Sequence, residues 1–216
     1  MRVLEIPFIA ENFPQDRENL LKSNFPEAHF KIDNATWKEY SYVPQVNGEI
    51  SAFNDGILLR YSVRERYTRA RFTKDNSPVY KDSCVEFFLS IDRKNYFNFE
   101  FNCIGCMLLQ YGESRQNRRF AGTEALERIV RYSTLGKNQF EEIEGDIKWK
   151  LGIFIPFSVI EDLSGIPVFQ NGRELWGNFY KCGDELTLPH YVTWNRVETA
   201  EPDFHRPEYF GKLVFE

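Results

Sequence analysis

The chain has 216 residues, of which 42% are hydrophobic, and its formal net charge is −5. This composition supports a folded core and argues against intrinsic disorder. No segment concentrates Lys and Arg as a phosphate-binding surface would, so we expect no nucleic-acid partner. No apolar run approaches the ~20 residues of a membrane span, so no span is expected. The N-terminal residues lack an export signal, which leaves the location open with the cytoplasm as the default expectation.

Short segments rich in aromatic and β-branched residues follow one another along the chain. In Tyr96–Asn102, Phe97, Phe99 and Phe101 alternate with polar residues, which is the period of a strand. The segments expected as strands are Ile50–Phe53, Ile57–Glu65, Cys84–Ile91, Tyr96–Asn102, Met107–Tyr111, Ile129–Ser133, Ile147–Ile155, Leu175–Cys182, Tyr191–Trp194 and Lys212–Phe215.

Turns and short helices account for the segments between these strands. Asn54–Gly56 contains Asp-Gly, a strong hairpin signal, and Asp92–Asn95 is expected to form a second turn. Helical signals are short and cover Asp16–Lys22, Thr123–Glu127 and Pro156–Leu163, where Pro156 or Ser158 would start the last helix.

Many short strands separated by turns are typical of a sandwich or barrel rather than of alternating β and α units. We predict an all-β fold, a two-sheet antiparallel β-sandwich of the jelly-roll or immunoglobulin-like kind with a few short helices. No repeat or linker divides the chain, so residues 1–216 are predicted to form a single domain.

The four cysteines do not show a zinc pattern. Cys103-Ile104-Gly105-Cys106 is a CxxC, but Cys84 and Cys182 are isolated in the sequence, whereas such a site needs a second pair. We expect buried or half-buried free thiols and no metal ligands. The arginines of Arg64–Arg71 are expected on a solvated strand face.

Motifs for nucleophilic or metal-dependent catalysis are missing, because there is no Gly-x-Ser-x-Gly, no His-Glu-x-x-His and no glycine-rich phosphate loop. Glu86 and Glu100 are on the polar faces of adjacent expected strands and could approach each other, as glycoside hydrolysis requires. Three interpretations stay open: polar residues of a half-exposed sheet, acceptors for sugar hydroxyls, or catalytic acids.

Three segments together resemble the carbohydrate-binding modules of family 9. They are Asn34–Trp37, with a small residue and a Trp; Tyr80–Leu89, which contains Asp-Ser-Cys-Val-Glu; and Pro202–Leu213, which closes with Phe-Gly-Lys-Leu. Their order and spacing fit this family from about Ile32 to Glu216, whereas residues 1–30 show no clear match.

The resemblance implies a sugar held between two aromatic rings, with polar side chains between them. It assigns Tyr80 and Phe204 as the rings and Glu86 as the hydrogen-bonding acid. Both ring positions usually carry Trp in the family. Glu100 stands where the family tends to have Arg, and His205 and Arg206, beside the second ring, are expected to replace that cation.

The resemblance therefore predicts non-catalytic binding of a mono- or oligosaccharide, with no catalytic residue. One alternative is a glycoside hydrolase using Glu86 and Glu100, and another is a protein-interaction sandwich that has lost its sugar site. Haem is disfavoured because His and Met are few. No cofactor is expected from the residues, but family members carry structural calcium, which stays open as an alternative. The four Trp residues are expected in the core.

Overall fold

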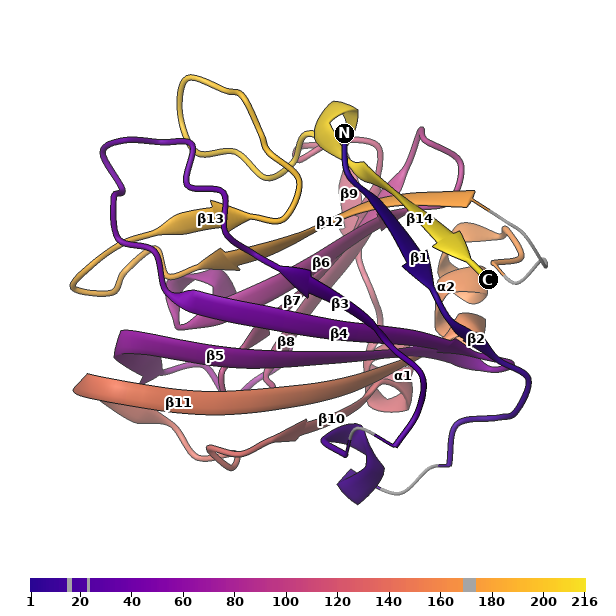
Figure 1. Cartoon of the computed structure of the whole chain (residues 1–216), viewed down its shortest axis with the longest axis horizontal. Helices are drawn as coiled ribbons and strands as arrows, with labels where there is room; N and C mark the ends of the chain where they lie inside the picture. The colour runs from indigo at the N-terminus through magenta and orange to yellow at the C-terminus, as the bar shows by residue number, and fades with distance from the viewer. Residues whose placement is uncertain (15–16, 23, 169–173) are drawn as a thin grey trace.

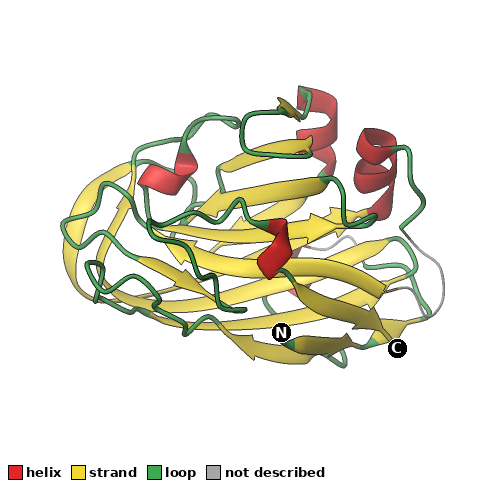
Figure 2. Ribbon diagram, turned by 90° about the horizontal axis from the view of Figure 1, so that it is seen from above, coloured by secondary structure: helices red, strands yellow, loops and turns green. Residues whose placement is uncertain are grey.

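A computed structural model describes residues 1–14, 17–22, 24–168 and 174–216, without the side chains of residues 17 and 18. These residues form two β-sheets packed against each other, shown from two directions in Figures 1 and 2. In spatial order, the eight-stranded sheet A contains β1 (Val3–Ile6), β14 (Gly211–Phe215), β12 (Glu174–Cys182), β6 (Cys84–Ser90), β7 (Tyr96–Asn102), β8 (Met107–Gly112) and β9 (Arg118–Phe120), with β13 (Tyr191–Thr193) beside β12.

Sheet B is six-stranded and forms the second layer. In spatial order it contains β10 (Val130–Ser133), β11 (Phe140–Pro156), β5 (Gly56–Ala70), β4 (Gln45–Phe53) and β2 (Phe8–Ile9), with β3 (Ala28–Lys31) beside β4. The predicted all-β sandwich is confirmed, and each expected strand coincides with an observed one.

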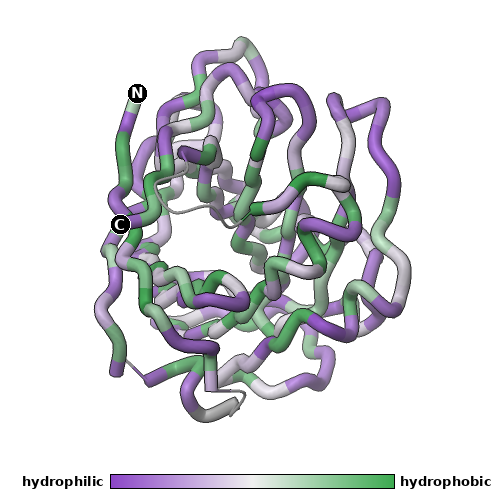
Figure 3. The backbone as a smooth tube through the Cα atoms, turned by 90° about the vertical axis from the view of Figure 1, so that its right-hand side faces the viewer, coloured by the Kyte–Doolittle hydropathy of each residue, from purple (hydrophilic) through white to green (hydrophobic). Residues whose placement is uncertain are grey.

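The main departures from the predicted sheets lie near the chain ends and at one sheet edge. Strands β1, β2, β3 and β9 were not predicted, and the pairs β1–β14 and β2–β4 are parallel rather than antiparallel. Because β1 lies beside β14, the two termini are on the same side of the molecule (Figure 3).

Helices are few and short, as expected. Helix α1 spans Thr123–Arg128, and α2 spans Phe157–Ser164, directly after Pro156. The expected helix at Asp16–Lys22 is reduced to a 3-10 turn, η1 (Arg17–Leu20), and Asp16 itself lies outside the described residues. None of the helices in the described ranges combines the length and apolar character needed to cross a membrane.

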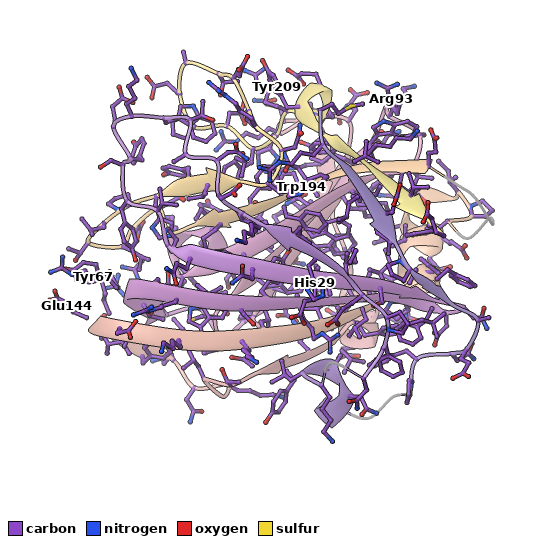
Figure 4. The ribbon with its side chains drawn as sticks, viewed as in Figure 1. His29, Tyr67, Arg93, Glu144, Trp194 and Tyr209 are labelled. Carbon is purple, nitrogen blue, oxygen red and sulfur yellow. The ribbon has the colours of Figure 1, made fainter. Side chains whose placement is uncertain are left out.

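The core fills the space between the sheets. The alternation predicted for β6 and β7 directs Val85, Phe87 and Phe99 inward, and all three are fully buried. Rings stack across this layer: Phe179 of β12 lies 4.9 Å from Phe87 and 3.9 Å from Phe30 of β3, between ring centroids. Of the four Trp residues, only Trp176 is not fully buried. Trp194, labelled in Figure 4, packs edge-on against Phe179.

The arginines of the Arg64–Arg71 run, on β5 and directly after it, divide between two environments. Arg64, Arg66 and Arg71 are exposed and pair with Asp146, Glu144 and Glu141 of β11, respectively, as a solvated strand face predicts. Figure 4 shows Glu144 beside Tyr67 at this outer end of the two strands. Arg69 departs from the prediction: it is 4% exposed and bonded to Asp82.

A buried ion pair joins the two sheets. Lys181 Nζ of β12 lies 2.9 Å from Glu65 Oε2 of β5, and both side chains are 0% exposed. Trp149 Nε1 donates to Glu65 Oε1 at 2.7 Å, and Lys181 Nζ donates to His190 Nε2 at 2.8 Å. Burial and the nearby Lys181 charge hold the pKa of His190 well below its usual value, so this ring is neutral.

We predict that Lys181→Met destabilises the fold by about 3–5 kcal/mol, because it leaves the Glu65 carboxylate buried without its cation. The double variant Lys181→Met with Glu65→Gln should recover a large part of that loss. Denaturant unfolding measures both free energies. A loss below about 1 kcal/mol in the single variant would show that the pair does not hold the sheets together.

Candidate functional site

A cavity of about 330 Å³ lies over the outer face of sheet A. Its floor comes from β6, β7, β8 and β12, and its walls come from four loops: those between β5 and β6, β8 and β9, β12 and β13, and β13 and β14. Residues lining it include Tyr80, Glu86, Glu100, Cys182, Phe204 and His205. Five of the six predicted site residues therefore meet at one place.

The two carboxylic acids of the floor face each other across neighbouring strands. The β6–β7 register pairs Glu86 with Glu100, and each is 3% exposed. The interpretation of this face as a half-exposed sheet is wrong, because the loops around the cavity cover it. The prediction that the two glutamates share one face and approach each other is confirmed.

Few donors are available to these acids. Glu86 Oε1 accepts a hydrogen bond from Cys182 Sγ at 3.2 Å, and Glu100 Oε1 accepts one from Asn98 Nδ2 at 2.7 Å. Glu100 Oε2 is buried and has no hydrogen-bond partner among the described residues. An acceptor of this kind is costly to bury, so it favours a ligand that brings a donor.

Burial also changes how these acids ionise. Loss of water raises the pKa of both Glu86 and Glu100, and the adjacent Glu100 charge raises that of Glu86 further. Asp184, on the wall of the same cavity, has its pKa raised to about 6, again chiefly by burial. These three carboxyl groups therefore keep their protons to a higher pH than ordinary surface carboxyl groups do.

Tyr80 is placed by a network around the Asp-Ser motif. It belongs to the 3-10 turn η2 (Val79–Lys81), which precedes Asp82. The carboxylate of Asp82 is fully buried and accepts from Arg69 Nε, from the backbone amides of Arg71 and Phe72, and from Asn102 Nδ2. Asp82 therefore anchors the loop that presents Tyr80 and does not itself line the cavity.

Phe204 reaches the cavity from the C-terminal loop. Its ring stacks on that of Tyr180 with 4.2 Å between centroids and 10° between planes, and its carbonyl accepts from Tyr180 Oη at 3.1 Å. Phe204 is 8% exposed, so one face is engaged with Tyr180 and only a small part of the ring borders the cavity. Tyr80, which is half-buried, is the more accessible of the two predicted rings.

His205 and Arg206 have different surroundings. His205 Nδ1 lies 3.0 Å from Arg118 Nη1 and 3.1 Å from Tyr96 Oη. Burial and the Arg118 charge lower the pKa of His205 to about 2, so it is a neutral acceptor and not a cation. Arg206 does not line the cavity and instead pairs with Asp203 at 2.8 Å and with Glu208.

The cations of the cavity are residues that the sequence analysis missed. Arg115 and Arg118 line it from the hairpin that joins β8 to β9, together with Phe120, which is 56% exposed. In the sequence, closely spaced arginines precede Phe120 and follow a predicted strand, and this pattern could have indicated a basic binding surface. Asp184 and Tyr191 complete the wall and were also missed.

Two groups of side chains among the described residues have a spacing compatible with a metal ion. Cys84, Glu86 and Cys182 form one group, in which Glu86 and Cys182 line the cavity, and Glu27, His29 and Glu49 form the other, away from the cavity. All four cysteines are buried free thiols, as predicted. Calcium prefers oxygen ligands, and the structural calcium implied by the family stays a prediction.

The raised carboxyl pKa values predict a pH dependence of stability. The folded state binds these protons more tightly than the unfolded chain, so the free energy of unfolding should fall as the pH rises from about 5 to about 8. Glu100→Gln should reduce that fall, with a gain on the order of 1 kcal/mol at pH 8. Thermal unfolding across this range measures both effects. Glu39→Gln, at an exposed position, is the matched control, and parallel profiles for Glu100→Gln and the unmodified chain would contradict the assignment.

Comparisons with known proteins identify the family and the fold of the chain. The sequence pattern of carbohydrate-binding family 9 matches residues 16–215. A crystal structure of a candidate carbohydrate-binding protein from Bacteroides uniformis is 36% identical, with a TM-score of 0.90, over 100% of this chain and 99% of that one. No curated protein matches the chain.

Two more distant structures have the same fold. Both are family 9 carbohydrate-binding modules from Caldicellulosiruptor kristjanssonii. The complex with cellotriose is 12% identical, with a TM-score of 0.59, over 100% of this chain and 94% of that one. The complex with glucose is 13% identical, with a TM-score of 0.58, over 98% of this chain and 95% of that one. From the match over residues 16–215 and the likeness to the B. uniformis structure, the chain belongs to carbohydrate-binding family 9.

Proposed function

We propose that the chain binds a mono- or oligosaccharide, without cleaving it, in the cavity over the outer face of sheet A. The observation that carries this proposal is the meeting of Tyr80, Phe204, Glu86 and Glu100 at one cavity, in a chain that belongs to family 9. These residues come from strands and loops far apart in the sequence. The family resemblance had assigned Tyr80, Phe204 and Glu86 to sugar binding, and Glu100 was the acid expected to approach Glu86.

The chemistry of the cavity suits a sugar. Aromatic rings pack against the C–H faces of a pyranose. Tyr80 and Phe204 border the cavity and offer such rings to a bound sugar. The exposed ring of Phe120 at the rim offers a third apolar surface. The unpartnered Glu100 Oε2 is an acceptor for a sugar hydroxyl, and Arg118 is a donor for a sugar oxygen.

Saccharides built from glucose are the first ligands to test, because the related modules were solved with glucose and with cellotriose. Weak binding is expected. A small polar ligand exchanges hydrogen bonds to water for hydrogen bonds to protein, and the net gain in free energy is small.

The arrangement of the two acids favours binding over hydrolysis. Glycosidases place their acids on the two sides of the scissile bond. Here Glu86 and Glu100 project from the same face of one sheet and lie side by side in the floor. Burial raises the pKa of both, which disfavours the ionised nucleophile or base that hydrolysis requires.

We predict that Tyr80→Ala and Phe204→Leu each weaken saccharide binding by roughly threefold to tenfold, because each removes a ring that borders the cavity. Isothermal titration calorimetry with cellotriose and glucose measures the change. Tyr132→Ala, which removes an exposed ring on β10 of sheet B, is the control and should bind as the unmodified chain does. If Tyr80→Ala and Phe204→Leu bind as tightly as the control and the unmodified chain, the sugar binds elsewhere.

We also predict no turnover. Prolonged incubation of the pure protein with cellotriose should release no new reducing ends, and Glu86→Gln should show the same background as the unmodified chain. Hydrolysis that disappears in Glu86→Gln would establish the catalytic alternative instead.

A further inference from the structure

We propose that Cys84, Cys182 and Glu86 form a site for a divalent transition-metal ion of the zinc class in the cavity floor. The two cysteines that are isolated in the sequence become neighbours in the fold, because the β12–β6 register places Cys182 directly opposite Cys84. Glu86 follows Cys84 by two residues, so its side chain projects from the same face of the sheet.

The spacing of the ligand atoms fits a tetrahedral ion. The two Sγ atoms and a carboxylate oxygen of Glu86 all lie within 4.8 Å of one another, and Cys182 Sγ is 3.2 Å from Glu86 Oε1. Zinc–sulfur and zinc–oxygen bonds of about 2.3 and 2.1 Å imply ligand-to-ligand edges of about 3.5–3.8 Å. These three atoms reach that arrangement through small side-chain adjustments.

The cavity supplies access and an open coordination position. Cys182 and Glu86 both line it, so an ion can enter and keep its fourth position toward the cavity. Glu100, opposite Glu86, has an unpartnered buried oxygen that can accept a hydrogen bond from a water in that position. Three protein ligands with one open position is a common arrangement for zinc.

The ligand types select the metal. Thiolates favour zinc, cadmium and cobalt over calcium and magnesium, which take oxygen ligands. The second group, Glu27, His29 and Glu49, is a weaker candidate, because Arg60 already forms ion pairs with both of its glutamates.

Binding is balanced by release of protons. Burial raises the pKa of both thiols, that of Cys84 to about 12, so both sulfurs carry protons without metal. One divalent ion replaces the two thiol protons and the proton held by Glu86, forms two metal–sulfur bonds and one metal–oxygen bond, and leaves the oxidation states unchanged. No co-reactant is needed.

A cobalt titration tests the site. With the full chain kept reduced by a phosphine, one Co²⁺ per chain should produce thiolate-to-cobalt charge-transfer absorption, and Zn²⁺ should abolish it by displacement. Cys84→Ser and Cys182→Ser should each lose most of this absorption. Cys103→Ser is the matched control, because Cys103 is also buried and contacts a backbone carbonyl, yet is outside the group.

Cadmium NMR of the unmodified chain gives a second readout that does not depend on the variants folding, and two coordinating thiolates are expected. No charge-transfer absorption in the unmodified chain, or fewer than two thiolates on cadmium, would overturn the site. Absorption that survives in both Cys84→Ser and Cys182→Ser and is lost in Cys103→Ser would also overturn the site. Saccharide titrations of the metal-free protein are scored separately, so failure of either proposal can be told from failure of the other.

Discussion

Glu86 and Glu100 are held directly opposite each other by the β6–β7 register, in the floor of a cavity walled by surface loops, and each is 3% exposed. Two buried acids this close cannot both ionise cheaply, so the site must retain protons or receive a ligand that satisfies them. The remaining features of the site can be understood as ways of holding this pair and shaping the space above it.

Two structural devices keep that space open and defined. Asp82 and Arg69 fasten the turn that carries Tyr80 to the end of β5, and Arg69 also donates to the carbonyl of Glu185 in a neighbouring loop. In the C-terminal loop, the ring of Phe204 stacks on that of Tyr180, and the Tyr180 hydroxyl donates to the Phe204 carbonyl. These contacts are made inside the protein, so the cavity walls are preorganised for a ligand, which lowers the ordering cost of binding.

The sequence predicted those parts of the fold and site that depend on local pattern. Alternation in β6 and β7 was enough to place Phe99 in the core and Glu100 on the opposite face. The family motifs brought Tyr80 and Phe204 to one cavity. Local pattern could not show that loops bury the outer face, because the covering segments are remote in the chain. It could not pair Cys84 with Cys182, since that contact depends on the long-range β12–β6 register.

Other misses have physical causes as well. The cations Arg115 and Arg118 line the cavity, and only the folding of the β8–β9 hairpin over the cavity reveals their position. Strands β1 to β3 have two to four residues each, and such short segments give little periodicity to detect.

Glycine at position 211 of the closing motif is explained by sterics, because a Cβ there would lie 2.3 Å from the ring of Trp194.

The most direct test of the account is a crystal structure of the chain soaked with a mixture of glucose and short glucose-based oligosaccharides. We expect electron density for a sugar inside the cavity, with a ring face on Tyr80 and a hydroxyl within hydrogen-bond distance of Glu100. Density for the sugar on another surface, or a cavity that takes up no saccharide at millimolar concentrations, would contradict it.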